Sequence, residues 1–431
     1  MQPLRIGLCG LGTVAQGVLA VLKENQQVID ARAGREIRVT RVASRTAKPE
    51  LDLLGAQFST ELNDVVDASD IDVVVEMIGG EDAALNLVRR ALELAKPVVT
   101  ANKAIVAAHG NELLALANAR QTAFGFEATV AGGVPIIASL TRALAGNKIR
   151  WLAGIINGTS NYILTAMAES GQAFDAALAE AQHLGYAEAD PSFDVEGIDA
   201  AHKLTIMAAL AFGIGFRFAD VYTEGITAVS VEDIEYARQL GYQVKHLGIG
   251  RNTDAGFELR VHPTLVPEKQ LLASVNGVMN AILVNGNAAG DTLYYGAGAG
   301  SLPTASAVVA DLIDIARGAS LPPVALAASD TRILSIEDVE CGFFLKIPSL
   351  DKPGVFAKVA TILSERKISI EAAIQKEQAI HTDSQDAWVP IIILTQRVRE
   401  GVMNQALEAI QRLPEVVADI TRLRVEYFLD G

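Results

Sequence analysis

Short apolar segments alternate with amphipathic ones along the first third of the chain. Four segments rich in β-branched residues predict strands: LRIGLCG (4–10), IRVTRVA (37–43), IDVVVEMIG (71–79) and PVVTA (97–101). Between them, VAQGVLAVLKENQQVI (14–29) and EDAALNLVRRALELA (81–95) place apolar residues at helical spacing. This alternation predicts a parallel sheet with helices on both faces, which is the architecture of α/β proteins.

Two further regions follow. Residues 131–296 mix helices with strands such as WLAGII (151–156) and FELRVHPTLV (257–266), and a glycine-rich loop and an apolar helix occupy 297–330. After a linker over 328–340, six segments follow the order β-α-β-β-α-β of a ferredoxin-like sandwich: FFLKIP, VFAKVATILSERK, ISIEAAIQ, WVPIIILTQ, EGVMNQALEAIQRL and VADITRLRVEY.

The bulk composition narrows the possible partners. The chain has 431 residues, half of them hydrophobic, which is enough for two or three domains with large cores. Its net charge of −15 repels phosphate backbones and anionic membranes, so we expect no nucleic-acid or membrane partner. Two isolated cysteines, with no signal-peptide pattern and no long apolar span, predict a cytoplasmic protein.

The segment GLGTVAQG (10–17) follows the first strand and opens the first helix. Gly10 permits a tight turn, Gly12 lets the backbone approach a pyrophosphate, and Ala15 fills the third small position of a dinucleotide-binding turn. The phosphates would meet the N-terminus of the helix, where Thr13 and Val14 are further candidate contacts. In this strand-turn-helix context the motif predicts a nicotinamide dinucleotide site.

The end of the second strand bears on the choice of cofactor. An acidic residue there would bind the ribose of NAD, but ASRTAK (43–48) contains none. Arg45 and Lys48 instead offer positive charge where a 2′-phosphate would lie. We therefore expect NADP(H) to be preferred over NAD(H), with two solvated loop cations as the alternative.

Another candidate segment is TANKA (100–104), which follows a strand at the edge of the sheet where ligands bind. Thr100 is a candidate cofactor contact. Lys103 could orient the nicotinamide or polarise a substrate carbonyl, and the alternative is an ordinary surface lysine at the start of a helix.

Charge is concentrated in LGYAEADPSFDVEGIDAAHKL (184–204), directly before the apolar run TIMAALAFGIGF. Pro191 prevents one continuous helix, so Glu188 lies on a loop and a helix is predicted to begin near Asp194. Asp199 and Lys203 are four residues apart on that helix, close enough to pair. A partly buried lysine held by a carboxylate is a protonated donor suited to a carbonyl oxygen.

Structural interpretations of the same residues remain open. The Asp199–Lys203 pair could be a helix-surface ion pair of about 0.3–0.5 kcal/mol. Asp190 and Asp194 could serve as turn and N-cap residues, and His202 is interpreted as structural.

Several ordered blocks resemble the homoserine dehydrogenase family. They are GLGTVAQGV, TANKA, FEATVAGGVPII (126–137), GIINGTSNYILT (154–165), LGYAEADPSFDVEGIDAAHKL and YGAGAGSLPTASAVVADL (295–312). The C-terminal segment SLDKPGVFAKVATIL resembles an ACT regulatory domain. The resemblance implies a Rossmann-type nucleotide-binding domain (1–130 plus 297–330), an α+β substrate and dimerisation domain (131–296) and a ferredoxin-like ACT domain (341–431).

By resemblance, the reaction is the reversible NAD(P)-linked interconversion of L-aspartate 4-semialdehyde and L-homoserine in threonine and methionine biosynthesis. Lys203 would be the general acid/base, Glu188 and Asp199 would bind the amino-acid substrate, and Lys103 would contact substrate and cofactor. Gly298, in the GAGAG loop, would reach the nicotinamide. The segment INGTSNY would lie on the sheet beneath the substrate pocket.

The family also implies a structural monovalent cation, sodium. Its ligands would be Glu127 and backbone oxygens of Val130, Gly132 and Val134. Two positions depart from the family pattern: Ala15 stands where glycine is frequent, and ASRTAK lacks the aspartate of many members, which leaves the cofactor preference open.

Regulation and assembly are also implied by the family alone. Threonine is the expected effector, near the turn formed by Pro353 and Gly354, and a homodimer or homotetramer is expected. The ACT domain could instead serve assembly without a ligand. Two other functions compete: aspartate-semialdehyde dehydrogenase, which needs a nucleophilic cysteine that neither Cys9 nor Cys341 fits, and a non-catalytic amino-acid sensor.

Overall fold

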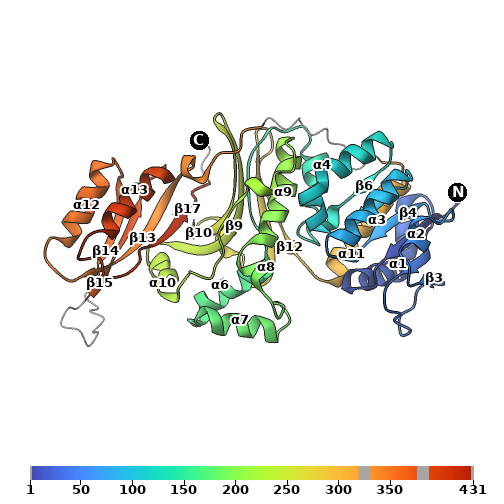
Figure 1. Cartoon of the computed structure of the whole chain (residues 1–431), viewed down its shortest axis with the longest axis horizontal. Helices are drawn as coiled ribbons and strands as arrows, with labels where there is room; N and C mark the ends of the chain where they lie inside the picture. Colours follow the sequence, from blue (N-terminus) through green and yellow to red (C-terminus); the bar gives the residue numbers. More distant parts are fainter. Residues whose placement is uncertain (1, 320–330, 376–387, 429–431) are drawn as a thin grey trace.

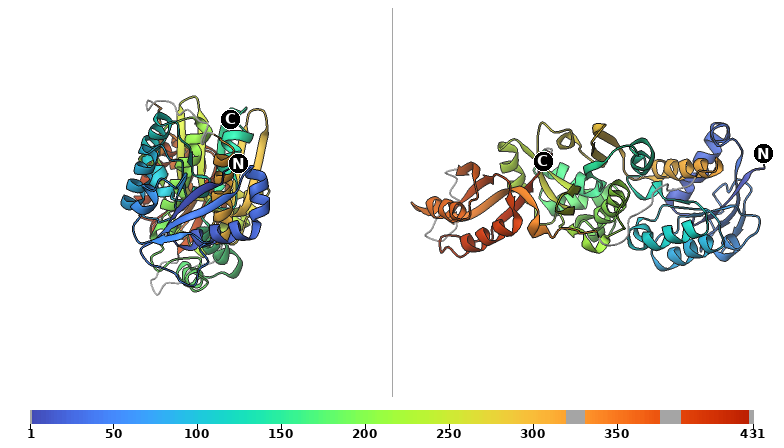
Figure 2. Two further views of the ribbon diagram at one scale, coloured as in Figure 1. Left: turned by 90° about the vertical axis from the view of Figure 1, so that its right-hand side faces the viewer. Right: turned by 90° about the horizontal axis from the view of Figure 1, so that it is seen from above.

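The computed structural model describes residues 2–319, 331–375 and 388–428. Figure 1 shows three units in a row along an elongated molecule. The N-terminal α/β unit lies at one end, the ferredoxin-like unit lies at the other, and a mixed unit joins them. The view from above in Figure 2 shows the same order.

The N-terminal unit is the predicted parallel sheet, with strand order β3-β2-β1-β4-β5-β6. Its strands are β1 (Leu4–Cys9), β2 (Ile37–Ala43), β3 (Gln57–Ser59), β4 (Val73–Glu76), β5 (Val98–Thr100) and β6 (Phe124–Gly125). Its helices are α1 (Thr13–Ala33), α2 (Asn63–Val66), α3 (Asp82–Glu93) and α4 (Lys103–Ala119). β4 is shorter than the predicted 71–79, because the chain leaves the sheet after Glu76 and turns at Gly79 and Gly80, both with positive φ.

A helix from much later in the sequence, α11 (Ser301–Ala316), packs against α1. A Cβ added at Gly17 would lie 2.5 Å from the carbonyl oxygen of Ser301, so the two helices meet at a glycine. Residues 301–316 thus share a core with the N-terminal sheet. The remainder of the predicted segment, 320–330, lies outside the described residues.

The middle and C-terminal units share one sheet of eleven strands. The middle unit contributes β7 (Ile149–Ile155), β8 (Tyr222–Thr223), β9 (Tyr242–Thr253), β10 (Gly256–Pro267), β11 (Met279–Gly286) and β12 (Gly290–Ala297). The C-terminal unit contributes β13 (Glu340–Leu350), β14 (Ile370–Gln375), β15 (Trp388–Thr395), β16 (Val398–Arg399) and β17 (Thr421–Val425). The join is a parallel pairing of β17 with β10, in which Arg424 lies opposite Thr264.

The C-terminal unit has the predicted ferredoxin-like order, β17-β13-β15-β14, with antiparallel pairing throughout. Its helices α12 (Val355–Glu365) and α13 (Glu400–Gln411) pack their apolar residues onto the side of β13 that carries Phe343, Leu345 and Ile347. The middle unit carries α5 (Ile136–Ala138), α6 (Gly158–Ser170), α7 (Phe174–His183), α8 (Ser192–Val195), α9 (Ile198–Phe212) and α10 (Val231–Gln239).

The segment before the apolar run is not the single helix predicted to begin near Asp194. Gly197 has a φ of 86°, a left-handed conformation that interrupts the helix. The short helix α8 therefore ends at Val195, and the long helix α9 begins at Ile198. The charged segment thus contains a junction between two helices.

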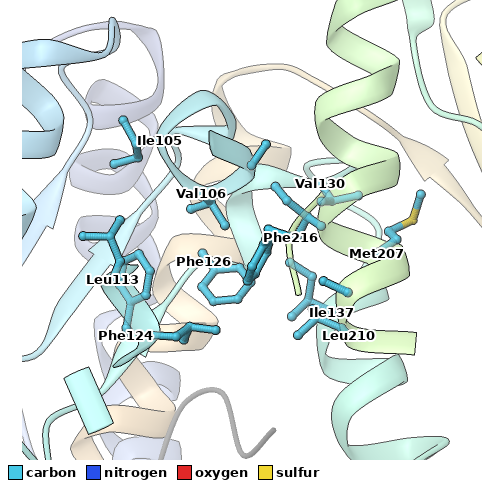
Figure 3. Packing of buried hydrophobic residues seen from close by; sticks show 14 of the residues in the cluster. Ile105, Val106, Leu113, Phe124, Phe126, Val130, Ile137, Met207, Leu210 and Phe216 are labelled. Atoms are coloured by element: carbon cyan, nitrogen blue, oxygen red, sulfur yellow. The ribbon is translucent and has the colours of Figure 1, made fainter. Parts of the chain in front are cut away.

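A shared core connects the N-terminal and middle units. Figure 3 shows Phe124 and Phe126 between side chains of α4, such as Leu113, and side chains of α9, such as Leu210. All of these side chains are buried. This packing fixes α4 beside α9, and the first turns of both helices meet at the candidate site. Among the described residues, no helix is long and apolar enough to cross a membrane.

Candidate active site

Lys203 and Asp199 form a buried ion pair on the first turns of α9. The Lys203 Nζ donates to Asp199 Oδ2 at 2.7 Å and to the carbonyl oxygen of Ile156 at 2.7 Å. Only 3% of Asp199 and 8% of Lys203 are exposed, so the predicted pair is not a helix-surface ion pair. Burial alone would raise the pKa of Asp199, but Lys203 and Lys103 outweigh it and hold the pKa below its ordinary value.

Asn157 and Asp194 complete this cluster, and neither of them was predicted as a site residue. The Asn157 Nδ2 donates to Asp199 Oδ2 at 2.8 Å and to Asp194 Oδ1 at 2.7 Å. Asp194 is not an N-cap, because it lies inside α8 and Pro191 occupies the N-cap position. Burial raises its pKa, as does the nearby Asp199, while the Asn157 hydrogen bond lowers it.

The segment INGTSNY packs on the sheet without being a strand of it. β7 ends at Ile155, and α6, which begins at Gly158, packs against β9 and β11. Asn157 is the N-cap of α6, and its Oδ1 accepts from the backbone N–H of Ser160 at 2.8 Å. The cap fixes the amide orientation, so its two N–H groups point at the carboxylates. An asparagine between an apolar strand and a helix was the signal available in the sequence.

Lys103 connects this cluster to a cavity between the N-terminal and middle units. Its Nζ lies 3.1 Å from Asp199 Oδ1 and 5.5 Å from the centre of the Phe193 ring. The cavity has a volume of about 410 Å³, and both Lys103 and Phe193 line it. The fold thus brings Lys103 to Asp199, and it makes Phe193 a wall residue of the cavity, which its sequence position did not indicate.

The floor of the cavity is built from the ends of β4 and β5. Glu76 is fully buried, and its Oε1 accepts from the backbone N–H of Ile78 at 2.8 Å. The hydroxyl of Thr100 donates to its other oxygen at 2.5 Å, and burial raises the pKa of Glu76. Asn102 then ties the two loops together by donating to the carbonyl oxygen of Gly80 at 2.6 Å. Thr100 therefore shapes the cavity from below.

The glycine-rich turn has the geometry that an anion requires. Gly10 has a φ of 107°, and a Cβ there would lie 2.5 Å from the carbonyl oxygen of Met77. A Cβ on Gly12 would meet open space, and no side chain caps the helix that begins at Thr13. The first N–H groups of α1 are therefore available to a ligand. Val14, in the same turn, lines the cavity.

The other candidate cofactor residues lie on the loops that follow β2 and β12. Arg45 is exposed and Lys48 is partly exposed, both on the loop that follows β2. Gly298 is buried where the loop after β12 packs on the middle unit, and a Cβ there would lie 2.1 Å from the Asn280 side chain. A side chain at position 298 would therefore require the Asn280 amide to move.

Two carboxylates precede α8, those of Glu188 and Asp190, and their surroundings differ. Glu188 is exposed, and its backbone oxygen accepts from the side chain of Gln182 at 3.0 Å. The structure describes no contact that brings its carboxylate to Lys203. Asp190 is a turn residue, because its Oδ1 accepts from the backbone N–H of Ser192 at 3.1 Å and from the Ser192 hydroxyl at 2.6 Å.

His202 follows the structural interpretation. Its ring stacks between Phe193 and Phe218, at centroid distances of 5.5 and 4.2 Å. Burial lowers the pKa of His202, so the ring is neutral near pH 7. It supports Phe193 at the cavity wall.

The proposed cation ligands lie where the sheet of the N-terminal unit ends. Glu127 is buried, and its carboxylate accepts from the backbone N–H groups of Ile137 at 3.0 Å and Ala138 at 2.6 Å. Burial raises the pKa of Glu127 to about 7. Val130 and Val134 are buried, and Gly132 turns the chain between them with a φ of 37°.

Both cysteines lie inside strands. Cys9 and Cys341 are buried, and burial raises the pKa of both thiols, to about 12 for Cys341. Neither can supply the exposed thiolate that an aspartate-semialdehyde dehydrogenase needs.

A dinucleotide-binding turn that opens toward a buried lysine–carboxylate cluster defines the class of NAD(P)-dependent oxidoreductases. Family models agree: the homoserine dehydrogenase NAD binding domain matches residues 10–127, homoserine dehydrogenase matches 135–313, and the ACT domain matches 347–415. The chain therefore belongs to the homoserine dehydrogenase family, and it interconverts L-aspartate 4-semialdehyde and L-homoserine with a nicotinamide cofactor.

Individual relatives match over their whole length. The homoserine dehydrogenase of Pseudomonas aeruginosa is 52% identical over 435 residues, covering 99% of each chain. That of Neisseria gonorrhoeae is 47% identical over 440 residues, covering 100% of each. The crystal structure of a homoserine dehydrogenase from Thiobacillus denitrificans superposes with a TM-score of 0.93 at 50% identity and covers 99% of both chains.

Proposed function

We propose that Lys203 is the general acid/base of this homoserine dehydrogenase. The observation that carries the proposal is the buried ion pair of Lys203 with Asp199, next to a cavity that Lys103 lines. The bound nicotinamide supplies or accepts the hydride. Lys203 gives a proton to the carbonyl oxygen of the semialdehyde, and takes it back from the hydroxyl of homoserine. Asp199 and the Ile156 carbonyl orient its three N–H donors.

The substrate is a zwitterion, so its ammonium group needs an anion. We infer that Glu188 and Asp199 supply it, with Asp194 as an additional carboxylate that the structure places beside Asn157. Lys103 would contact the substrate and the cofactor from the opposite side of Asp199.

Replacing Glu188 by alanine is expected to raise the Michaelis constant for homoserine at least about tenfold while leaving that for NADP(H) unchanged. Glu188→Gln should do less damage, because its amide oxygen can still accept a hydrogen bond from the ammonium group. Initial rates measured with homoserine varied, and then with NADP(H) varied, give the two Michaelis constants. Glu180, an exposed carboxylate on α7, provides the control Glu180→Ala. Normal homoserine binding by both Glu188 variants would make Glu188 a solvated loop charge.

We propose that the cofactor is preferentially NADP(H). Gly10, Gly12, Thr13 and Val14 would receive the pyrophosphate. Arg45 and Lys48, on the loop after β2, would bind a 2′-phosphate. Thr100 and Lys103 would lie beneath the nicotinamide, and Gly298 would approach it from the loop after β12.

Arg45→Ala should raise the Michaelis constant for NADPH roughly tenfold, a loss of about 1.4 kcal/mol, and should leave that for NADH unchanged. The reason is that only NADPH carries the phosphate that the guanidinium would bind. Arg38→Ala removes an exposed arginine of β2, the strand before that loop, and serves as the matched control; Arg38 pairs with Glu36 at 2.7 Å. A wild-type enzyme that prefers NADH would refute the assignment.

We further propose a sodium ion held by Glu127 and by carbonyl oxygens of Val130, Gly132 and Val134. The residues fit such an ion, because carboxylate and carbonyl oxygens are the donors that hard cations prefer. A bound cation would also keep Glu127 ionised against the burial that raises its pKa. Among the described residues, no cluster of three or more His, Cys, Asp or Glu side chains could hold a metal instead.

Regulation and assembly complete the proposal. Threonine would bind near Pro353 and Gly354, where α12 begins at Val355 and its free N–H groups can receive a carboxylate. We propose domains at 1–130 plus 297–330, 131–296 and 341–431, in a cytoplasmic homodimer or homotetramer.

Threonine titrated against the intact enzyme is expected to inhibit it, and Phe356→Asp should weaken the inhibition by placing a negative charge in the first turn of α12. Thr361→Asp, on the exposed middle of the same helix, is the control. Equal inhibition of all three proteins by threonine would show that the effector binds at another site. If none responds, the ACT domain is an assembly module.

A further inference from the structure

Arg424 carries a buried charge at the boundary between the C-terminal and middle units. It lies on β17, the strand that Figure 1 shows beside β10. Its guanidinium pairs with both oxygens of Glu400, the first residue of α13, at 2.7 and 2.6 Å. Its Nη1 donates to Glu224 Oε2 at 2.7 Å, and its Nη2 donates to the Tyr222 hydroxyl at 2.9 Å. Glu224 and Tyr222 belong to the middle unit, so Arg424 joins the two units by an ion pair.

The backbone of Glu224 is held by the strands of the middle unit. Its N–H donates to the carbonyl oxygen of Val261 in β10 at 2.8 Å. Its own carbonyl oxygen accepts from the Nε2 of His246, a buried residue of β9, at 3.0 Å. The side chain and both backbone groups of Glu224 are therefore engaged, which leaves it little freedom to move independently.

The next two residues contact the junction between α8 and α9. A Cβ added at Gly225 would lie 2.4 Å from the carbonyl oxygen of Val195 and 2.7 Å from the Cα of Glu196. The backbone N–H of Ile226 donates to the same Val195 oxygen at 2.8 Å. Contacts this close transmit a displacement of one segment to the other, because packed backbone is not compressible.

The junction sets the position of the carboxylates in the active site. Asp194 precedes Val195 in α8, and Asp199 follows Gly197 by two residues in α9. The ring of His246 lies 3.1 Å from where a Cβ of Gly197 would be, so His246 contacts the junction as well as Glu224. A shift of the junction would move both carboxylates relative to Asn157.

We propose that Glu224 is a positioning residue through which Arg424 of the ACT domain sets the arrangement of Asp194 and Asp199. The inference rests on the proposed roles of these two carboxylates in the substrate pocket. The contacts run without a gap from β17 through Glu224 to the α8–α9 junction. A change at β17 should therefore alter affinity for the amino-acid substrate and leave cofactor binding alone, because the junction does not carry the glycine-rich turn.

A second buried ion pair crosses the same boundary and provides a matched control. Glu426, directly after β17, accepts from Arg251 at 2.5 Å and from Arg260 at 2.8 Å. Among the contacts that the structure describes for Glu426, none reaches α8 or α9. Glu426→Gln weakens the join between the units without touching the route through Glu224.

The experiment compares Glu224→Ala, Glu224→Gln and Glu426→Gln in the full chain. Glu224 is part-exposed, so both of its variants should fold, which thermal melting checks. Glu224→Ala is expected to raise the Michaelis constant for homoserine roughly fivefold or more, within the range of coupling between linked sites. The constant for NADP should not change. Glu224→Gln should be closer to wild type, because its amide oxygen still accepts from Arg424.

Two results would overturn the proposal: an unchanged homoserine constant in a folded Glu224→Ala enzyme, or an equal rise in Glu426→Gln, which would indicate general loosening of the boundary. A failure of the catalytic role proposed for Lys203 would be a separate result, because it would appear as normal turnover when Lys203 is replaced. The Michaelis constants of the Glu224 and Glu426 variants could still be compared in that case.

Discussion

Lys203→Ala is expected to lower kcat by about 10²–10⁴-fold, the contribution of a positioned acid or base. The affinity for NADP(H) should remain within a factor of about two, because the nucleotide turn at Gly10 and Gly12 lies in a different unit. Asp199 keeps two partners in the variant, Asn157 at 2.8 Å and Lys103 at 3.1 Å, so its charge is not left unpaired. Single-turnover rates and fluorescence titration of NADPH measure the two effects separately.

Removing a buried lysine also costs stability, and a second buried lysine separates that effect from catalysis. Lys245 on β9 donates to the carbonyl oxygen of Val275 at 2.7 Å and to Asn276 Oδ1 at 2.8 Å. Lys245→Ala should lower the melting temperature and leave kcat close to wild type. Near-normal turnover in a folded Lys203→Ala enzyme would contradict the acid/base assignment. If Lys245→Ala lowers kcat as much as Lys203→Ala does, the loss of turnover is not specific to Lys203.

Asp199→Asn is the second large effect, with kcat expected to fall roughly 10²-fold. The variant leaves the ammonium groups of Lys203 and Lys103 facing a neutral amide, so Lys203 loses the charge that orients it. The free energy of unfolding should fall by about 3 kcal/mol, as when a buried ion pair loses one partner. Chemical denaturation at pH 7 measures this loss, and steady-state kinetics measure kcat.

The pH dependence of that stability loss has a definite sign. Because Lys203 and Lys103 hold the pKa of Asp199 below its unfolded value, the carboxylate stabilises the fold above the unfolded pKa of about 4. This contribution is lost as the pH falls through the folded pKa. The difference between wild type and Asp199→Asn should therefore shrink on acidification. Asp233→Asn, which removes a buried carboxylate 2.7 Å from Lys346, should lose stability without losing turnover. A difference that grows toward low pH would contradict the ion-pair account.

Most elements of the fold were predictable because they follow local rules. The strand over 37–43 has the predicted bounds, since β-branched residues alternate between two turn signals. The order β-α-β-β-α-β over the C-terminal region is also confirmed. The break at Gly197 was missed, because the apolar periodicity continues across it and only the backbone conformation reveals the left-handed residue. The pairing of β17 with β10 was missed too, since no local pattern specifies which edges of two distant sheets will meet.

The part of the candidate site that depends on local spacing was also predictable from the sequence. Asp199 and Lys203 could be paired from sequence because four residues on a helix define a distance. Asn157 lies 42 positions before Asp199, and only the fold brings its amide to the carboxylates. Phe193 and Glu76 were missed for the same reason: their roles depend on which side of a cavity they line.

The continuous sheet has a consequence for the order of folding during synthesis. β10 is complete at Pro267, but its parallel partner β17 begins only at Thr421. For the whole interval of translation, the outer edge of β10 near Thr264 lacks its final neighbour and presents unpaired backbone groups to other chains. The sheet that the two units share is therefore complete only when the last strand has been made. We expect a chain that ends within the C-terminal region to keep this edge of β10 open to pairing with other chains.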